Sequence, residues 1–263
     1  MNFKITLGQY YPVHSPIHSL DPRVKLIATI NFIVVLFIAS TVVEYAIIAA
    51  FLFGSIKIAN VPIMFVMRGV RALMYIIAFT MILNTLFAPG ETVLVQFWRI
   101  TITLEALQWA IQMSVRLIML LISSSVLTLT TSPISLTGAI ESLLGPFKKI
   151  NAPVHEIAMM MTIALRFIPT LLEEMDKITK AQMARGAGFD TGSISKRVKN
   201  LIPVLVPLFV SAFRRADELA MAMDARCYRG DVNRTKMNEL MYTKADFVAL
   251  CFIFLLTAVI LIV

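Results

Sequence analysis

Two arginines stand in matching surroundings about forty residues apart, and both have side chains suited to recognition chemistry. Arg185 lies in AQMARG and Arg226 in AMDARC, so each follows the pattern Ala-x-x-Ala-Arg and precedes a small residue. A guanidinium is always charged and offers a planar fork of donors to carboxylates or phosphates. The six residues at these two points are Ala184, Arg185 and Gly186, and Ala225, Arg226 and Cys227.

Two interpretations fit this repeat. Arginine complements the negative end of the helix dipole, so two alanine-rich helix ends could carry arginines for stability alone. The small neighbours favour a different role, because they leave the guanidinium protruding from a flat surface, where it could enter an acidic groove on a partner. An acidic residue also stands nine positions before each arginine, at Asp176 and Asp217.

Other chemistry has little support in the sequence. The run GAGFDTG, which begins at Gly186, follows no strand pattern and contains no Gly-Lys-Ser/Thr, so it does not match a phosphate-binding loop. The chain has three histidines and two cysteines, and the nearest approach to metal-ligand spacing is His18 beside Asp21. We therefore expect no catalytic residue, no cofactor, no metal site and no ATP hydrolysis by this chain.

The helices that carry the two arginines lie in a charged segment at residues 132–242. A short amphipathic helix begins after Ser132-Pro133, which fits an N-cap and a first-turn proline. Residues 153–185 are predicted to form one long helix, or two joined at Pro169. Residues 193–226 repeat the plan, with an apolar middle and a charged, alanine-rich end.

The remainder of the chain has the composition of an integral membrane protein. It is 58% hydrophobic and 15% charged, whereas soluble domains are about a quarter charged. Apolar runs occur at residues 26–43, 45–58, 72–88, 104–131 and 247–263. We expect an all-α membrane protein with about five transmembrane helices. Its three parts are predicted to be an N-terminal membrane domain at 1–131, a cytoplasmic domain at 132–242, and a C-terminal transmembrane helix at 243–263.

The basic residues predict the orientation in the membrane, because Lys and Arg collect in cytoplasmic loops. Arg23 and Lys25 precede the first apolar run, and Lys57, Arg68 and Arg71 lie between the second and third. Glu44 and Glu91 occupy the other loops. The N-terminus and the charged segment are therefore predicted to be cytoplasmic. We assign the net charge of +8 to these flanks rather than to nucleic-acid binding.

Arg116 is the one basic residue inside the fourth apolar run. An ionisable group within a span is costly and is a functional-site hypothesis by default. The alternative is that Arg116 lies near the membrane interface and extends its charge to water.

The sequence resembles the transmembrane T component (EcfT) of energy-coupling factor transporters, which are bacterial ABC-type importers of vitamins and metal ions. The resemblance covers essentially the whole chain. It rests on HSLDPRVKL before the first span, RLIMLLISSSVLTLTTSPISL at the fourth, EIAMMMTIALRFIPTLLEE with AQMARG, and RRADELAMAMDARCYRG. The last three are similar to the family's fourth span and its coupling helices.

The resemblance implies a non-enzymatic subunit in the bacterial cell membrane. Its partners would be two cytoplasmic ABC ATPases, one for each arginine, and a membrane-embedded substrate-binding S component for vitamin or other micronutrient uptake. Crossed coupling helices, one short and two long, would pass the motion of the ATPases to the S component. The ATPase contacts would fall on Arg185 and Arg226. Cys227 stands where glycine would match the first arginine's neighbour.

The alternative function is a self-contained membrane transporter or a membrane-embedded enzyme. Arg116, together with Glu156 and Arg166 in an apolar helix, would motivate it. Such an enzyme should carry clustered acids, histidines or cysteines in its spans. A secondary transporter should show inverted repeats, whereas the visible repeat lies in the predicted cytoplasmic segment.

Overall fold

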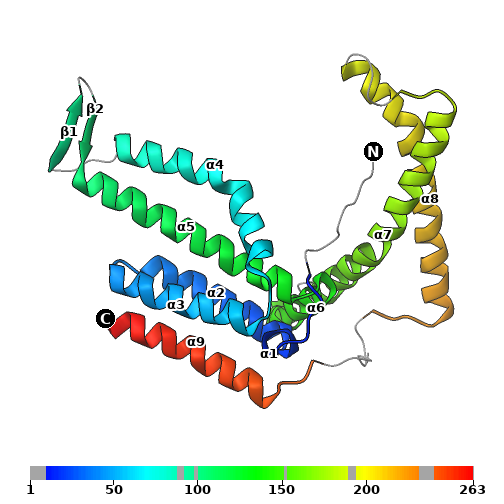
Figure 1. Cartoon of the computed structure of the whole chain (residues 1–263). Coiled ribbons are helices and arrows are strands. Elements are labelled where there is room, and N and C mark those ends of the chain that lie inside the picture. The colour runs from blue at the N-terminus through cyan, green and yellow to red at the C-terminus, as the bar shows by residue number, and fades with distance from the viewer. Residues whose placement is uncertain are drawn as a thin grey trace. The chain divides into compact units, whose positions relative to one another are not determined.

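The structure is a computed structural model, and it describes residues 10–87, 92–97, 100–150, 153–188, 194–230 and 240–262. Almost all of the secondary structure is helical (Figure 1). In chain order the elements are α1 Pro16–Ser19, α2 Pro22–Ile38, α3 Val42–Ile58, α4 Ile63–Phe87, β1 Val93–Phe97, β2 Ile100–Thr103, α5 Leu104–Thr130, α6 Pro133–Leu143, the 3₁₀ helix η1 Gly145–Ile150, α7 Val154–Ala184, α8 Ile194–Ala225 and α9 Lys244–Ile262.

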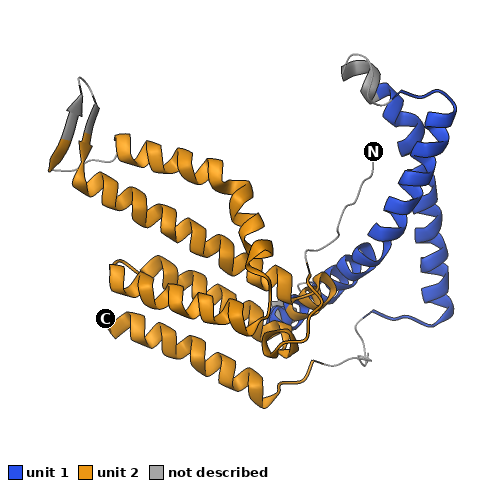
Figure 2. Cartoon of the chain, in the orientation of Figure 1, with its two compact units in different colours: residues 1–7, 140–238 blue, residues 8–139, 239–263 orange. Residues whose placement is uncertain are grey.

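The chain forms two compact units (Figure 2). The first comprises residues 8–139 and 239–263, and we call it the bundle unit. The second is made mainly of residues 140–238, and we call it the paired-helix unit.

Helices α2 and α9 of the bundle unit run in the same direction. Near the start of both, the backbone N–H of Asp21 donates to Asp246 Oδ1 at 2.7 Å. Further along, Asn31 Nδ2 donates to Thr257 Oγ1 at 2.6 Å. The two residues of each contact are 225 and 226 positions apart in the sequence. A separation that stays nearly constant along two helices shows that they run parallel.

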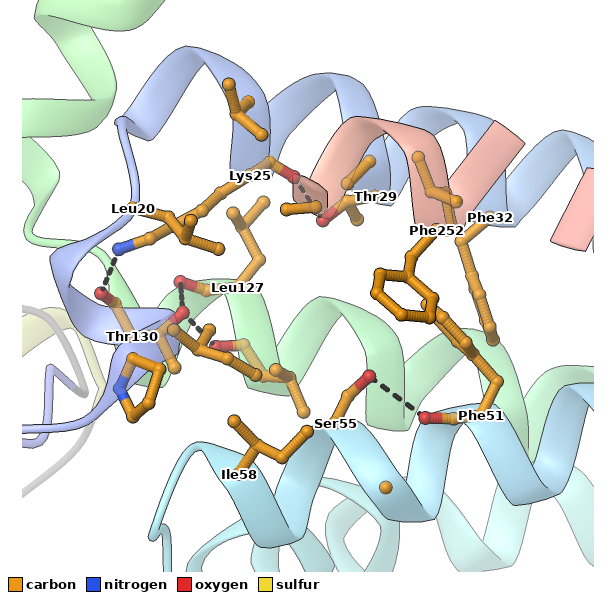
Figure 3. A pocket seen from close by; sticks show the side chains of 18 of the residues that line it. Leu20, Lys25, Thr29, Phe32, Phe51, Ser55, Ile58, Leu127, Thr130 and Phe252 are labelled. Atoms are coloured by element: carbon orange, nitrogen blue, oxygen red, sulfur yellow. Dashed lines mark hydrogen bonds between the residues drawn. The ribbon is translucent and has the colours of Figure 1, made fainter. Parts of the chain in front are cut away.

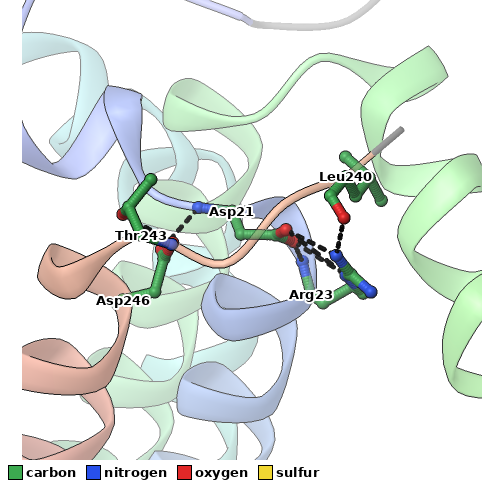
Figure 4. A network of polar contacts seen from close by, with 5 residues as sticks. All are labelled: Asp21, Arg23, Leu240, Thr243 and Asp246. Carbon is green, nitrogen blue, oxygen red and sulfur yellow. Dashed lines mark hydrogen bonds and ion pairs between the residues drawn. The ribbon is translucent and has the colours of Figure 1, made fainter. Parts of the chain in front are cut away.

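A polar network fixes the start of α9 beside the start of α2 (Figure 4). The carboxylate of Asp246 accepts hydrogen bonds from the backbone N–H and the hydroxyl of Thr243, both at 2.7 Å. Arg23 Nη2 lies 2.9 Å from Asp21 Oδ2 in an ion pair, and the same guanidinium donates to the carbonyl of Leu240. These contacts join segments more than two hundred residues apart in sequence.

Helix α5 runs antiparallel to α2. Lys25, in the first turn of α2, donates to the carbonyl of Thr130 at the end of α5, with a distance of 3.0 Å between Nζ and O. At the other end, Arg116 donates to the carbonyl of Ala39, just after α2. The short turns after α2 and α3 reverse the chain, so the bundle helices alternate in direction. Thr41 and Glu44 form a capping box that begins α3 after the first of these turns.

The bundle has a small core and a large apolar surface. Phe32, Leu36, Ile48 and Ile253 are among the buried core residues. In contrast, many large apolar side chains are exposed, including Tyr75 at 88%. So many exposed apolar side chains indicate contact with a membrane or with another protein.

Within the described residues, four helices are long and apolar enough to cross a membrane, namely α4, α5, α7 and α9. Helices α2 and α3 have 17 residues each, near the short limit of about 17 for a spanning helix. The predicted all-α membrane class is confirmed.

Two local predictions differ from the structure. Helix α4 begins at Ile63, nine residues before the predicted apolar run, and includes Arg68 and Arg71. The apolar run identifies only the apolar part of this helix. The helical backbone hydrogen bonding already begins in the charged segment that precedes the run. The second difference is an antiparallel hairpin in which Val93 pairs with Thr103 and Phe97 with Ile100. No strand was predicted from the sequence between the third and fourth apolar runs.

The paired-helix unit consists chiefly of two long helices that run in opposite directions and cross (Figure 1). Arg215 Nη2 of α8 forms an ion pair with Glu174 Oε2 of α7 at 3.0 Å. Toward the end of α7, Gln182 Nε2 donates to the carbonyl of Pro203 at 3.5 Å. Helix α7 is continuous through Pro169, so the single-helix form of the prediction is correct.

Candidate functional site

The first arginine ends α7 in a Schellman motif. Arg185 is the C-cap, and Gly186 follows with a φ of 90°. The N–H of Gly186 donates to the carbonyl of Met183 at 2.9 Å, and the N–H of Ala187 donates to the carbonyl of Gln182 at 3.0 Å. These two bonds satisfy carbonyls that the helix itself leaves unpaired.

The second arginine ends α8 in the same motif. The N–H of Cys227 donates to the carbonyl of Asp224 at 2.9 Å, and the N–H of Tyr228 donates to the carbonyl of Met223 at 3.1 Å. Cys227 has a φ of 55° and therefore takes the place of the glycine. Arg226 thus stands at the position of Arg185, so the sequence repeat corresponds to a repeat in backbone geometry.

All six predicted site residues, at 184–186 and 225–227, are exposed. Within the described part of the chain, neither arginine side chain has a hydrogen bond or an ion pair, and none of the described residues neutralises either charge. The negative ends of two helix dipoles favour a cation here, but that effect does not require an exposed guanidinium. The arrangement leaves two complete sets of donors available for carboxylates of a partner.

The two arginines lie at opposite ends of the crossed pair. Tyr228, two residues after Arg226, places its hydroxyl 3.1 Å from Met159 Sδ near the start of α7. Arg185 lies at the far end of the same helix. About 25 residues of α7 separate these levels, which at 1.5 Å per residue is roughly 38 Å along the helix. The two arginines are therefore well separated along α7.

Polar contacts hold the chain just beyond each arginine. His155, which is buried, lies with Nδ1 3.0 Å from Glu141 Oε1 and with Nε2 3.4 Å from the hydroxyl of Tyr228. Beyond the first arginine, Asn200 Nδ2 donates to the carbonyl of Gly188. These anchoring residues could not be found from the sequence, because no motif links His155 to Tyr228. Residues 189–192 of the glycine-rich run lie outside the described residues.

The other predicted polar residues do not join this site. Asp176 pairs with Lys180 on its own helix at 2.6 Å. Glu156 and Arg166 are both exposed and form no ion pair with each other. Among the described residues, no group of three or more His, Cys, Asp or Glu side chains is placed to hold a metal ion.

Arg116 has a structural position at the end of α2. Its Nη2 donates to the carbonyl of Ala39 at 2.9 Å, and its Nε donates to the hydroxyl of Tyr45 at 3.1 Å. The carbonyl of Ala39 also accepts from that hydroxyl at 3.2 Å. Arg116 therefore completes the hydrogen bonding of a helix end, and its half-buried guanidinium is held within the protein.

Comparisons with known proteins identify the family to which the chain is similar. The family described as cobalt transport protein (CbiQ) matches residues 14–237. An energy-coupling factor transporter transmembrane protein EcfT from Acidaminococcus fermentans is 52% identical over 243 residues, covering 92% of this chain and 90% of the relative. The EcfT of Thermosediminibacter oceani is 50% identical, covering 94% and 92%. The EcfT of Bacillus subtilis is 43% identical, covering 91% of each chain.

Proposed function

The chain belongs to the cobalt transport protein family, with the energy-coupling factor transporter transmembrane proteins as relatives, and we propose that it is the coupling subunit of such a transporter. In this role two cytoplasmic ATPases bind the subunit and hydrolyse ATP. A separate membrane-embedded S component binds a vitamin or other micronutrient. The chain passes motion from the ATPases to that component and catalyses no reaction itself.

The observation that carries the proposal is the pair of matched arginine ends. Arg185 and Arg226 occupy the same backbone position, are exposed, and have no partner among the described residues. Their separation of roughly 38 Å along α7 suits one ATPase for each arginine. A forked, permanently charged side chain at each point would enter an acidic groove on its ATPase.

Transmission of motion needs helices that move as connected bodies. The ion pair of Glu174 with Arg215 joins α7 to α8 at their crossing. The contacts of His155 with Glu141 and Tyr228 tie the segment beyond Arg226 to the start of α7 and to α6. A push on either arginine would therefore act on both helices.

In the proposed topology, the bundle helices α2, α3, α4, α5 and α9 form the five spans, in the three-part organisation predicted from the sequence. Basic residues lie at one end of these helices. They are Arg23 at the start of α2, Lys57 at the end of α3, Arg68 near the start of α4 and Lys244 at the start of α9. This basic end is assigned to the cytoplasm, together with the N-terminus and residues 132–242. Glu44 lies at the opposite end, and Glu91 lies outside the described residues.

Charge reversal of the arginines tests the docking role. The full transporter is purified through a tag on this chain, and the number of bound ATPase subunits is measured by native mass spectrometry. Arg185→Glu or Arg226→Glu alone should leave one ATPase bound, and the double variant should leave none. Arg214→Glu is the matched control, since Arg214 is exposed on α8 and forms an ion pair with Glu218 on its own helix.

Intact assembly and uptake in the double variant would exclude the docking role. Uptake by the purified chain alone in liposomes would instead identify a self-contained transporter, which is the alternative to a coupling subunit.

A further inference from the structure

A cavity of about 600 Å³ lies inside the bundle unit, between α1, α2, α3, α5 and α9. Sites for small molecules commonly have volumes of about 300–1,000 Å³. The proposed coupling role uses no such cavity, because the arginines that carry it lie in the other unit.

The cavity has one polar end and one aromatic end (Figure 3). The ammonium of Lys25 lies near Leu20 and Thr130 at the polar end. The rings of Phe32, Phe51 and Phe252 gather at the other end. A ligand that fills this space must be long, largely apolar, and polar at one end only.

Three of the four hydroxyl groups that line the cavity donate to carbonyls of their own helices, and the fourth belongs to Ser123. Thr29 donates to the carbonyl of Lys25 at 2.8 Å, and Ser55 donates to the carbonyl of Phe51 at 2.9 Å. Thr130 donates to the carbonyl of Val126 at 2.8 Å. These three hydroxyls are bonded to their own helices, so the wall that they form behaves as an apolar surface.

Lys25 differs from these residues. Its side chain lines the cavity, and the residue is only 7% exposed. Its ammonium donates to the carbonyls of His18 and Thr130, both at 3.0 Å. An ammonium has three N–H donors, and the third has no partner among the described residues. A buried donor without a partner is costly, so the cavity favours a ligand that carries an acceptor oxygen at this end.

The cavity opens toward the apolar outer surface of the bundle. Ile58, Val248 and Phe252 all line it, and each is more than half exposed. In a spanning bundle this surface faces lipid, so a lipid chain can enter sideways without crossing water.

We propose that this cavity binds one acyl chain of a membrane phospholipid, with an ester or phosphate oxygen accepting the third N–H of Lys25. The carboxylates of Asp21 and Asp246 act electrostatically on Lys25, and Arg23 offsets part of their charge. The site therefore supplies a hydrogen-bond donor rather than a surplus of positive charge. It binds zwitterionic and anionic phospholipids comparably.

Gly54 allows the cavity to be filled without disturbing the fold. It lines the cavity, and a Cβ added there would meet no atom within 4 Å. The full chain is reconstituted with palmitoyl-oleoyl phosphatidylcholine, extracted in mild detergent, and the retained lipid is measured by native mass spectrometry. Wild type should retain one molecule. Gly54→Leu should lower retention by about tenfold and Gly54→Ala by less, because the added side chain displaces buried alkyl contacts.

Gly138→Leu is the control, since Gly138 is also helical and open but lies outside the cavity. Circular dichroism establishes that each variant is folded. The lipid should also raise the thermal midpoint of wild type but not that of Gly54→Leu. Equal retention by Gly54→Leu and wild type, equal loss in Gly138→Leu, or retention of oleic acid but not phosphatidylcholine would each overturn the proposal.

Discussion

Cys227 has a left-handed backbone, which disfavours every residue with a Cβ relative to glycine. Its φ of 55° is imposed by the Schellman motif after Arg226, and Gly186 has the same role after Arg185 at no steric cost. We predict that Cys227→Gly stabilises the end of α8 by about 1 kcal/mol. The measurement is the thermal midpoint of the purified chain in detergent, which should rise.

The reciprocal change is Gly186→Ala, which should lower the midpoint by a similar free energy, about 1 kcal/mol. Space is not the cause, because a Cβ at Gly186 would meet no atom within 4 Å. A fall in midpoint for Cys227→Gly would show that the thiol makes a contact that outweighs the backbone strain.

Arg116 donates a hydrogen bond at the end of α2. Its removal should therefore lower the stability of the chain rather than act directly on transport. We predict that Arg116→Met destabilises the chain by about 1–3 kcal/mol, because the carbonyl of Ala39 loses a charged donor. Denaturant titration in detergent micelles measures this.

Gln112→Met is the comparison for Arg116→Met. Gln112 donates one exposed hydrogen bond to the carbonyl of Ser40 in the same turn, so its loss should cost about 0.5 kcal/mol. Equal effects of the two variants would show that Arg116 contributes no more than a surface contact.

At the scale of elements, the helices were predictable wherever local chemistry decides the structure. The apolar runs located the bundle helices, and the two Ala-x-x-Ala-Arg patterns located the ends of α7 and α8. The hairpin of β1 and β2 was missed because its nine strand residues lie within one connecting loop. The start of α4 was missed because hydropathy does not detect a charged helical turn.

Contacts distant in the sequence were not predictable. His155 and Tyr228 are 73 residues apart and meet only because α7 and α8 run antiparallel and cross. The two Schellman motifs are local, so glycine after the first arginine was a usable signal. No comparable signal identifies Asn200, whose amide reaches back to Gly188 across the connection between the helices.

The contact between α7 and α8 leads to a prediction about how motion is transmitted between these helices. Arg215→Glu would bring two carboxylates together where α7 meets α8, and we expect a loss of about 0.5–1 kcal/mol. Adding Glu174→Arg to this variant should recover most of that stability, because the side chains are only 35% and 25% exposed and the ion pair is simply exchanged. Thermal midpoints of wild type, Arg215→Glu, Glu174→Arg and the double variant give the coupling energy.

Measurements of uptake distinguish a role of Arg215 in transmitting motion from a role in docking the ATPases. With both arginine ends unaltered, the Arg215→Glu transporter should retain its ATPases but import more slowly, and the charge-swapped variant should recover. Arg214→Glu breaks an ion pair within α8 alone and should leave uptake near wild type. Loss of ATPases from Arg215→Glu would place Arg215 in docking instead.

At the scale of the whole molecule, the direction of α9 determines where the chain ends. Helix α9 starts beside the start of α2, through the contact of Asp21 with Asp246, and stays parallel to α2. If α2 crosses from the cytoplasm outward, then α9 does so too. The two helices cannot end on opposite sides of the membrane while these contacts hold.

Cysteine labelling in cells tests this topology. In a chain with Cys227→Gly and Cys251→Ser, we add either Ser40→Cys, in the exposed turn after α2, or Lys244→Cys, at the exposed start of α9. An impermeant maleimide should label the first in intact cells and the second only after permeabilisation. The reverse pattern would invert the bundle and place both arginines outside, away from any cytoplasmic ATPase. Labelling of both in intact cells would separate the starts of α9 and α2 and contradict their parallel pairing.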